Sequence, residues 1–247
     1  MTSDIRIFAT VEARMSSTRL PGKVLMEAAG KPFLAHMVER LERVSSLDGI
    51  IIATTINPID DPIQECARQL GVECFRGSED DVLQRVLDAA IAYNVDVIVE
   101  MTGDCPLIDP ALVESCIQEY LETGYDYVSN VLERTYPIGM DTQVFSTKTL
   151  AEAAESTNDP KDREHVSLYI YRHPERYRLR NILGPSELTR PKLRLTLDTQ
   201  EDFQLLRRIF EELYPTNCRF GLAEILALID ERPDLAELNA HVQHQYV

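Results

Sequence analysis

The chain has 247 residues and 44% of them are hydrophobic, which is enough for a substantial core. Its 41 acidic and 25 basic side chains give a formal net charge of −16, which argues against a nucleic-acid partner because such a charge repels phosphate backbones. The sequence has neither an apolar run of about eighteen residues nor a signal peptide, so no membrane span and no export are expected. We therefore expect a cytoplasmic protein whose five cysteines, which form no CxxC pair, stay reduced.

The first half of the chain alternates short apolar runs with helix-type stripes, a pattern typical of a parallel sheet with crossover helices. We expect strands at Arg6–Val11, Gly49–Thr54, Val72–Phe75, Val95–Met101 and Tyr125–Ser129. Apolar residues at helical spacing predict helices around residues 33–44, 63–70, 82–91 and 112–121. This order predicts a doubly wound α/β sheet.

The second half, after Asn130, has a looser rhythm. It predicts a short strand through Phe145, helices near 147–156 and 162–172, strands at 177–182 and 193–197, and helices at 203–213 and 222–229. No Gly/Ser-rich linker divides the chain, so we expect a single domain over residues 1–247, with a less regular region at about 130–190. Residues 161–194 also hold nine basic and four acidic side chains, which indicate a solvated face, a subunit contact or a site for a small acidic substrate.

The most informative segment follows the first predicted strand. Its loop carries Arg14, Ser16, Ser17, Thr18, Arg19 and Lys23. Hydroxyls, backbone N–H groups and cations in one loop can wrap a phosphate, and ligands collect at strand carboxyl ends of such sheets. The alternative is a solvated connector whose charges serve only solubility.

Two aspartates end apolar segments elsewhere. Asp104 follows the predicted strand at 95–101, and Asp198 follows the one at 193–197. Each alone is typical of a helix N-cap or an Asx turn. Together with the cationic loop they supply phosphate donors and two carboxylates, the parts needed for magnesium-assisted phosphoryl or nucleotidyl transfer.

Several motifs then occur in a specific order. They are ARMSSTRLPGKVL, FRGSEDDVLQR, TGDCPLIDP, YPIGMD, REHVSLYI and TLDTQEDF. With them the chain resembles the spore coat polysaccharide cytidylyltransferases of the SpsF type, within the acylneuraminate and deoxy-octulosonate cytidylyltransferase superfamily. The resemblance extends from about residue 5 to about residue 210, and its RxxSxRLPGK signature is specific.

The resemblance implies an α/β, Rossmann-like nucleotidyltransferase fold with a mostly parallel central sheet and helices on both faces. It implies Mg²⁺-dependent transfer of CMP from CTP to a small acidic sugar in surface polysaccharide biosynthesis, by a homodimer whose region 130–190 binds acceptor and partner subunit. The residues that it implies are Arg14, Ser16 and Lys23 for the triphosphate, Arg76, Gly77, Ser78 and Thr102 for the nucleotide, Asp104 and Asp198 for the metal, and Asp141, Glu164 and His165 for the acceptor. Arg14, Lys23 and Asp104 are the expected catalytic groups.

Two alternatives stay open. A glycosyltransferase with a nucleotide-sugar donor would share the architecture, although Asp104 stands alone in TGDCP and forms no DxD motif. A nucleotide-binding protein without turnover would keep the same residues. Thr102 stands where octulosonate enzymes carry Gln, and Thr196 where acylneuraminate enzymes carry a second aspartate, so the acceptor and the number of metals are not fixed by sequence.

Overall fold

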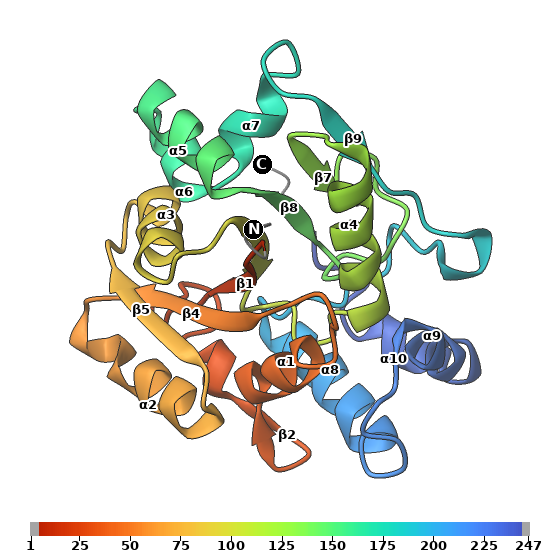
Figure 1. Cartoon of the computed structure of the whole chain (residues 1–247). Coiled ribbons are helices and arrows are strands. Elements are labelled where there is room, and N and C mark those ends of the chain that lie inside the picture. Colours follow the sequence, from red (N-terminus) through yellow and green to blue (C-terminus); the bar gives the residue numbers. More distant parts are fainter. Residues whose placement is uncertain (1–4, 244–247) are drawn as a thin grey trace.

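The computed structural model of the chain describes residues 5–243. A seven-stranded sheet in the order β5-β4-β1-β6-β8-β7-β9 runs through it (Figure 1). Its strands are β1 (Ile7–Glu12), β4 (Gly49–Thr55), β5 (Glu73–Gly77), β6 (Val97–Thr102), β7 (Tyr127–Ser129), β8 (Gln143–Ser146) and β9 (Leu179–Asn181). Within this sheet β8 is antiparallel to both of its neighbours, while the other pairs are parallel. The predicted mostly parallel sheet is confirmed.

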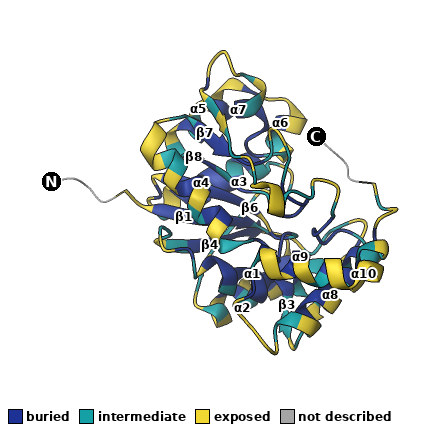
Figure 2. Ribbon diagram, turned by 90° about the vertical axis from the view of Figure 1, so that its right-hand side faces the viewer, coloured by how far each residue is buried: buried dark blue, intermediate teal, exposed yellow. Residues whose placement is uncertain are grey.

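Helices cover both faces of the sheet, as predicted. One face packs against α1 (Phe33–Leu41), α2 (Asp61–Leu70), α4 (Pro110–Thr123), α8 (Gln200–Leu213), α9 (Leu222–Glu231) and α10 (Pro233–Glu237). The other packs against α3 (Val82–Ala92), α5 (Thr147–Ser156) and α7 (Leu168–Arg172), with α6 (Pro160–Glu164) beside them. Figure 2 shows the buried strands between helices whose outer faces are exposed.

The connections add short elements. They are the 3₁₀ turns η1 (Lys23–Leu25), η2 (Pro58–Asp60) and η3 (Ser186–Leu188), and a hairpin of β2 (Glu27–Ala28) with β3 (Lys31–Pro32). No helix among residues 5–243 has the length and apolar character needed to cross a membrane.

The structure departs from the predicted elements in three places. The segment 193–197 is not a strand, because it pairs with the chain through a single bridge, between Ile138 and Arg194. Gly139 follows with a φ of 99° and lies so close to this segment that a Cβ would come within 2.6 Å of the Leu195 carbonyl oxygen, and no further bridge forms there. The predicted helix at 162–172 is two short helices, α6 and α7, and α10 is an additional helix near the C-terminus.

The carboxyl ends of β1 and β6 are adjacent, because Glu12 pairs in register with Thr102. The loop after β1 and the TGD turn after β6 therefore leave the same edge of the sheet. Leu197 reaches that edge from the second half of the chain, since its N–H donates to the Asp104 carbonyl over 2.8 Å. Three segments that are distant in sequence thus meet at one place.

Candidate active site

The loop after β1 is closed by its own backbone. Gly22 donates its N–H to the Met15 carbonyl over 2.9 Å, and its φ of 72° lies in the left-handed region that favours glycine. The loop is fixed from outside by Asp60, whose Oδ1 accepts the Met15 N–H over 2.7 Å. Lys23 follows directly as the first residue of η1, so its side chain leaves a constrained turn.

Lys23 lies between the two aspartates that the sequence singled out. Its Nζ donates to Asp104 Oδ2 over 2.8 Å and to Asp198 Oδ1 over 2.7 Å. Burial lowers the pKa of Lys23, but the two carboxylates raise it more, and the net shift is upward. The cationic loop and both aspartates therefore form one site.

Close backbone contacts hold Asp104 in this position. A Cβ on Gly103 would come within 2.9 Å of the Glu12 carbonyl oxygen, so glycine is required where β6 passes β1. The Asp104 carbonyl accepts the Leu197 N–H and, over 3.1 Å, the Thr196 hydroxyl. The turn that carries Asp104 is thus tied to the segment that carries Asp198.

Asp198 is surrounded by three cations. Besides Lys23, it contacts Arg19 at 3.2 Å through Oδ1 and Arg194 at 2.8 Å through Oδ2. Burial raises the pKa of the carboxyl, but Lys23, and then the two arginines, lower it to about 2. Asp198 is therefore ionised at neutral pH. Arg19, to which the RxxSxRLPGK signature gave no role, pairs with this carboxylate.

Arg14 and Ser16 lie beside a residue that the sequence analysis did not single out. Glu79, in the connection from β5 to α3, accepts the Ser16 hydroxyl over 2.6 Å and lies 3.9 Å from Arg14 Nη1. Hydrogen bonds from Ser16 and Asn57 lower the pKa of Glu79. A carboxylate thus occupies the anion-binding groups of the loop. Its place in the FRGSEDDVLQR motif, next to Ser78, is a signal that could have found it.

Arg76, Gly77, Ser78 and Thr102 are predicted nucleotide contacts. Arg76 donates to the carbonyls of Thr55 and Asn57 and pairs with Asp61 at 2.6 Å, so its guanidinium holds the connection between β4 and α2 together. Gly77 is the last residue of β5, and Ser78 follows it, with its Oγ accepting the Asp81 N–H. Thr102 is exposed at the end of β6. The nucleotide role of all four stays a prediction.

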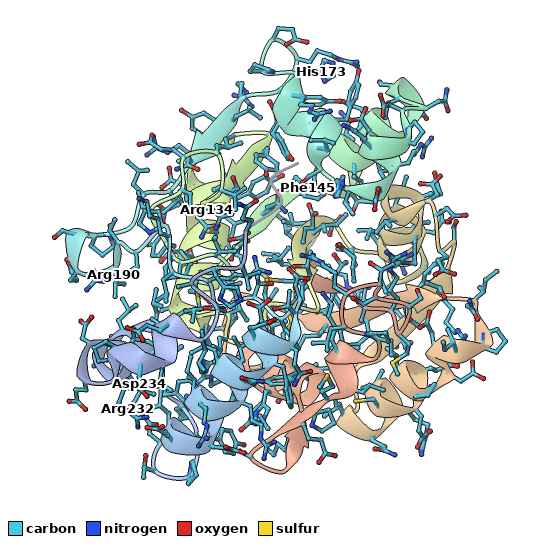
Figure 3. The ribbon with its side chains drawn as sticks, turned by 180° about the vertical axis from the view of Figure 1, so that it is seen from behind. Arg134, Phe145, His173, Arg190, Arg232 and Asp234 are labelled. Carbon is cyan, nitrogen blue, oxygen red and sulfur yellow. The ribbon has the colours of Figure 1, made fainter. Side chains whose placement is uncertain are left out.

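Of the predicted acceptor residues, Glu164 and His165 lie together, with 3.9 Å between Glu164 Oε2 and His165 Nε2, whereas Asp141 pairs elsewhere. Asp141 forms a bidentate pair with Arg134 at 2.6 and 2.9 Å, and Figure 3 places Arg134 in the body of the molecule. Asp141 also belongs to the electrostatic surroundings of Cys105, next to Asp104. Glu164 and His165 end α6 on the other face of the sheet, where burial lowers the pKa of His165.

Two buried carboxyls under α3 and α7 were missed by the sequence analysis. Glu12 and Glu100 lie on neighbouring strands and face the same side of the sheet. Burial raises the pKa of Glu100 to about 7, although hydrogen bonds with Ser167 and Gln143 lower it. Burial, and then the charge of Glu100, raise the pKa of Glu12. Period-two alternation of the strands would have shown both as core positions with an unusual residue type.

The basic island at 161–194 is largely consumed by ion pairs within the chain. The pairs are Arg163–Asp81, Arg172–Asp162, Arg178–Asp126, Arg180–Glu119, Arg190–Asp230 and Arg194–Asp202. Most of these arginines therefore neutralise neighbouring acids rather than form a free basic surface.

The comparisons with known proteins agree with the geometry. A family model described as "Cytidylyltransferase" matches residues 8–244. The spore coat polysaccharide biosynthesis protein SpsF of Bacillus subtilis is 32% identical over 93% of this chain and 96% of its own length. A 3-deoxy-manno-octulosonate cytidylyltransferase of Geobacter metallireducens is 30% identical over 68% of this chain and 75% of its own length. The solved structure of a cytidylyltransferase from Leptospira borgpetersenii has a TM-score of 0.89 and 32% identity, covering 98% of this chain and 100% of its own. The resemblance that the motifs indicate is confirmed.

Proposed function

Because the chain belongs to the cytidylyltransferase family, we propose that it transfers CMP from CTP to a small acidic sugar and releases pyrophosphate, in a Mg²⁺-dependent reaction. The observation that carries this proposal is the convergence of Asp104 and Asp198 on the Lys23 ammonium. A cation already lies between two carboxylate oxygens from distant segments, at the edge of the sheet where ligands of α/β folds bind.

The residues present fit Mg²⁺. Asp104 and Asp198 offer hard oxygen ligands, and Mg²⁺ is commonly held by one or two carboxylates together with substrate phosphates. No group of three or more potential ligands occurs among the described residues, which agrees with a site completed by the nucleotide. When bound there with CTP, the ion would neutralise charge on the triphosphate and polarise its phosphoryl oxygens.

The side chains of the loop would bind the triphosphate. Arg14 and Ser16 would exchange Glu79 for phosphate oxygens, and Lys23 would move its ammonium from the aspartates to the triphosphate. An acceptor oxygen then attacks the α-phosphorus in line. The new O–P bond forms as the bond to the bridging oxygen of pyrophosphate breaks, and Lys23 and Arg14 stabilise the charge that develops.

The acceptor proposal is supported by the names of the relatives. One takes part in spore coat polysaccharide biosynthesis, and another is a cytidylyltransferase for 3-deoxy-manno-octulosonate, an acidic sugar. Asp141, whose charge acts on Cys105 next to Asp104, and Glu164 with His165 would contact such an acceptor. His165, whose pKa is lowered by burial, would be neutral at pH 7 and able to accept a proton. Family membership gives no support to the glycosyltransferase alternative.

A pyrophosphate-release assay tests the proposal. The four common nucleoside triphosphates would be crossed with a panel of acidic sugars in the presence of Mg²⁺. We expect release with CTP and at least one acidic sugar, and its loss with EDTA. Binding of CTP without release from any acceptor would contradict the proposal and favour a nucleotide-binding protein without turnover.

We also propose a homodimer formed through the region 130–190. β9 is an edge strand of the sheet, and Leu183, just after it, is 53% exposed. The Glu133 N–H donates to Asn181 in β9, so the segment with the 39% exposed Leu132 lies next to this edge strand. Light scattering should give about twice the chain mass of 28.1 kDa, and a species of 28.1 kDa at micromolar concentration would contradict this.

A cytoplasmic location is part of the same proposal. All five cysteines are free thiols in the structure, as expected for a reducing compartment. The proposed donor, CTP, is also an intracellular metabolite. Cell fractionation with an antibody against the chain would test this, and recovery outside the cytoplasm would contradict it.

A further inference from the structure

Arg194 is a buried arginine that contacts both Asp198 and Asp202. Its side chain is 3% exposed, although it lies in a segment without regular strand pairing. Nη2 donates to Asp198 Oδ2 over 2.8 Å and to Asp202 Oδ2 over 3.0 Å, and Nε donates to Asp202 Oδ1 over 2.8 Å. This guanidinium does not face the position of Lys23, because it holds the opposite oxygen of Asp198.

Asp202 completes a closed network behind Asp198. Its side chain is fully buried and accepts the N–H groups of Asp198 and Thr199, both over 3.0 Å, in addition to the two bonds from Arg194. The capping box with Thr199 starts α8 at the same place. The backbone and the side chain of Asp198 are therefore both anchored to one ion pair.

Asn239 brings the C-terminal segment into the network. It is 2% exposed, and its Nδ2 donates to Asp202 Oδ1 over 2.8 Å and to the Arg194 carbonyl over 3.0 Å. Residues beyond about 210 lie outside the family resemblance seen in the sequence, yet one of them fixes both partners of the buried pair. The segment after α10 thus contributes to the geometry of the site.

The two oxygens of Asp198 have different surroundings. Oδ2 is held by Arg194, whereas Oδ1 faces Lys23 and Arg19. Because the buried Arg194 holds Oδ2, the carboxylate is oriented with Oδ1 toward Lys23, where the proposed ligand would bind. Such partners of metal-binding carboxylates orient them, and their loss typically weakens metal affinity by about 10- to 100-fold.

We infer that Arg194 is a positioning residue, which with Asp202 and Asn239 fixes Asp198 so that its Oδ1 is presented to the metal–triphosphate complex. The inference rests on the proposed function and assigns a role that does not involve contact with the substrate. It commits Arg194 to metal affinity rather than to CTP recognition, because Nε and Nη2 are engaged by Asp202 and by the Oδ2 atom of Asp198.

The test measures Mn²⁺ binding to the protein, with free Mn²⁺ followed by electron paramagnetic resonance. Because CTP itself chelates the ion, the Mn²⁺ bound by the same CTP without protein is measured and subtracted. The proteins are the wild type, Arg194→Met and Arg194→Lys, each with saturating CTP. We expect Arg194→Met to raise the Kd for Mn²⁺ at least tenfold and Arg194→Lys to raise it less, because lysine keeps the charge and loses the fork. The Kd for CTP without metal should change less than twofold in both.

Arg40→Met is the matched control. Arg40 is also 3% exposed and donates to the Phe220 carbonyl over 2.8 Å, away from the aspartates. Its loss should lower the melting temperature without changing the Kd for Mn²⁺. A merely structural role for Arg194 would give the same pattern as this control and would overturn the inference.

Asn239→Ala keeps the inference testable if Arg194→Met does not fold. This variant removes one donor from Asp202 and leaves every charge in place, so we expect a Kd for Mn²⁺ raised by about three- to tenfold. Unchanged Mn²⁺ binding in both Asn239→Ala and Arg194→Lys would overturn the inference alone. Failure of the wild type to bind Mn²⁺ with CTP would instead overturn the proposed metal-dependent function and, with it, this role.

Discussion

Asp104 and Asp198 each direct one carboxylate oxygen at the same Lys23 ammonium, at 2.8 and 2.7 Å. Two like charges are stable at this spacing because the cation lies between them. The arrangement leaves a place for a divalent ion once Lys23 moves to a triphosphate. Binding of metal and of nucleotide should therefore be linked.

Asp104→Asn should lower kcat by about 100-fold or more, because the amide is a poor ligand for a hard cation. The change keeps the shape of the side chain, so the melting temperature should fall by only a few degrees. Asp230→Asn, at an exposed pair with Arg190, is the control and should leave kcat unchanged. Wild-type turnover of Asp104→Asn at saturating Mg²⁺ would exclude Asp104 as a metal ligand.

Lys23→Met should have opposite effects on metal binding and turnover. Without CTP, the variant lacks the cation between Asp104 and Asp198, although Arg19 and Arg194 still pair with Asp198. Mn²⁺ should therefore bind several-fold more tightly than to the wild type. With CTP, kcat should fall and the KM for CTP should rise together, because the same ammonium is lost from the triphosphate. Isothermal titration and pyrophosphate release measure the two effects. An effect on the acceptor KM alone would place Lys23 elsewhere in the reaction.

Glu79→Gln should strengthen CTP binding, because a carboxylate no longer competes with phosphate for Ser16 and Arg14. Exposed ion pairs are weak, so we expect a Kd for CTP lowered by about two- to fivefold. Glu155→Gln, an exposed change on α5, is the control. If Glu79→Gln bound CTP more weakly than the wild type, Glu79 would be a contact of the nucleotide and not its competitor.

Glu100→Gln should make the free energy of unfolding less dependent on pH. Burial raises the pKa of Glu100 from 4.5 to about 7, so the folded protein binds more protons than the unfolded chain between these values. The wild type therefore loses stability as pH rises from about 4.5 to about 7, and Glu100→Gln lacks this part of the loss. From about pH 5 to about pH 8, the free energy of unfolding measured with urea should fall by about 1–3 kcal/mol more for the wild type than for Glu100→Gln. A difference independent of pH would refute the shifted pKa.

The regular half of the fold could be predicted because periodicity reflects burial on one face. Apolar spacing marks the buried faces of β1, β4 and α3, because these elements pack one or both faces against the core. The segment 193–197 looked like a strand for the same reason. Leu195 and Leu197 are buried, yet only one bridge forms, because pairing depends on Ile138 and the turn at Gly139, which are distant in sequence.

The site could be predicted only as far as its motifs reach. Lys23, Asp104 and Asp198 lie in segments that end strands or begin turns, where residue type indicates chemistry. Arg194 and Asn239 carry no such signal, since a charged residue in an apolar run and an asparagine near a C-terminus have many causes. Their contacts with Asp202 depend on how α8 and the C-terminal segment pack, which spacing does not encode.

A crystal structure with CTP and Mn²⁺ tests the shared use of the two aspartates most directly. The anomalous signal of Mn²⁺ should lie between Asp104, Asp198 and the triphosphate, with the Lys23 ammonium moved from the carboxylates to a phosphate oxygen. A metal bound away from both aspartates, or Lys23 still bridging them with CTP in place, would contradict the proposed site.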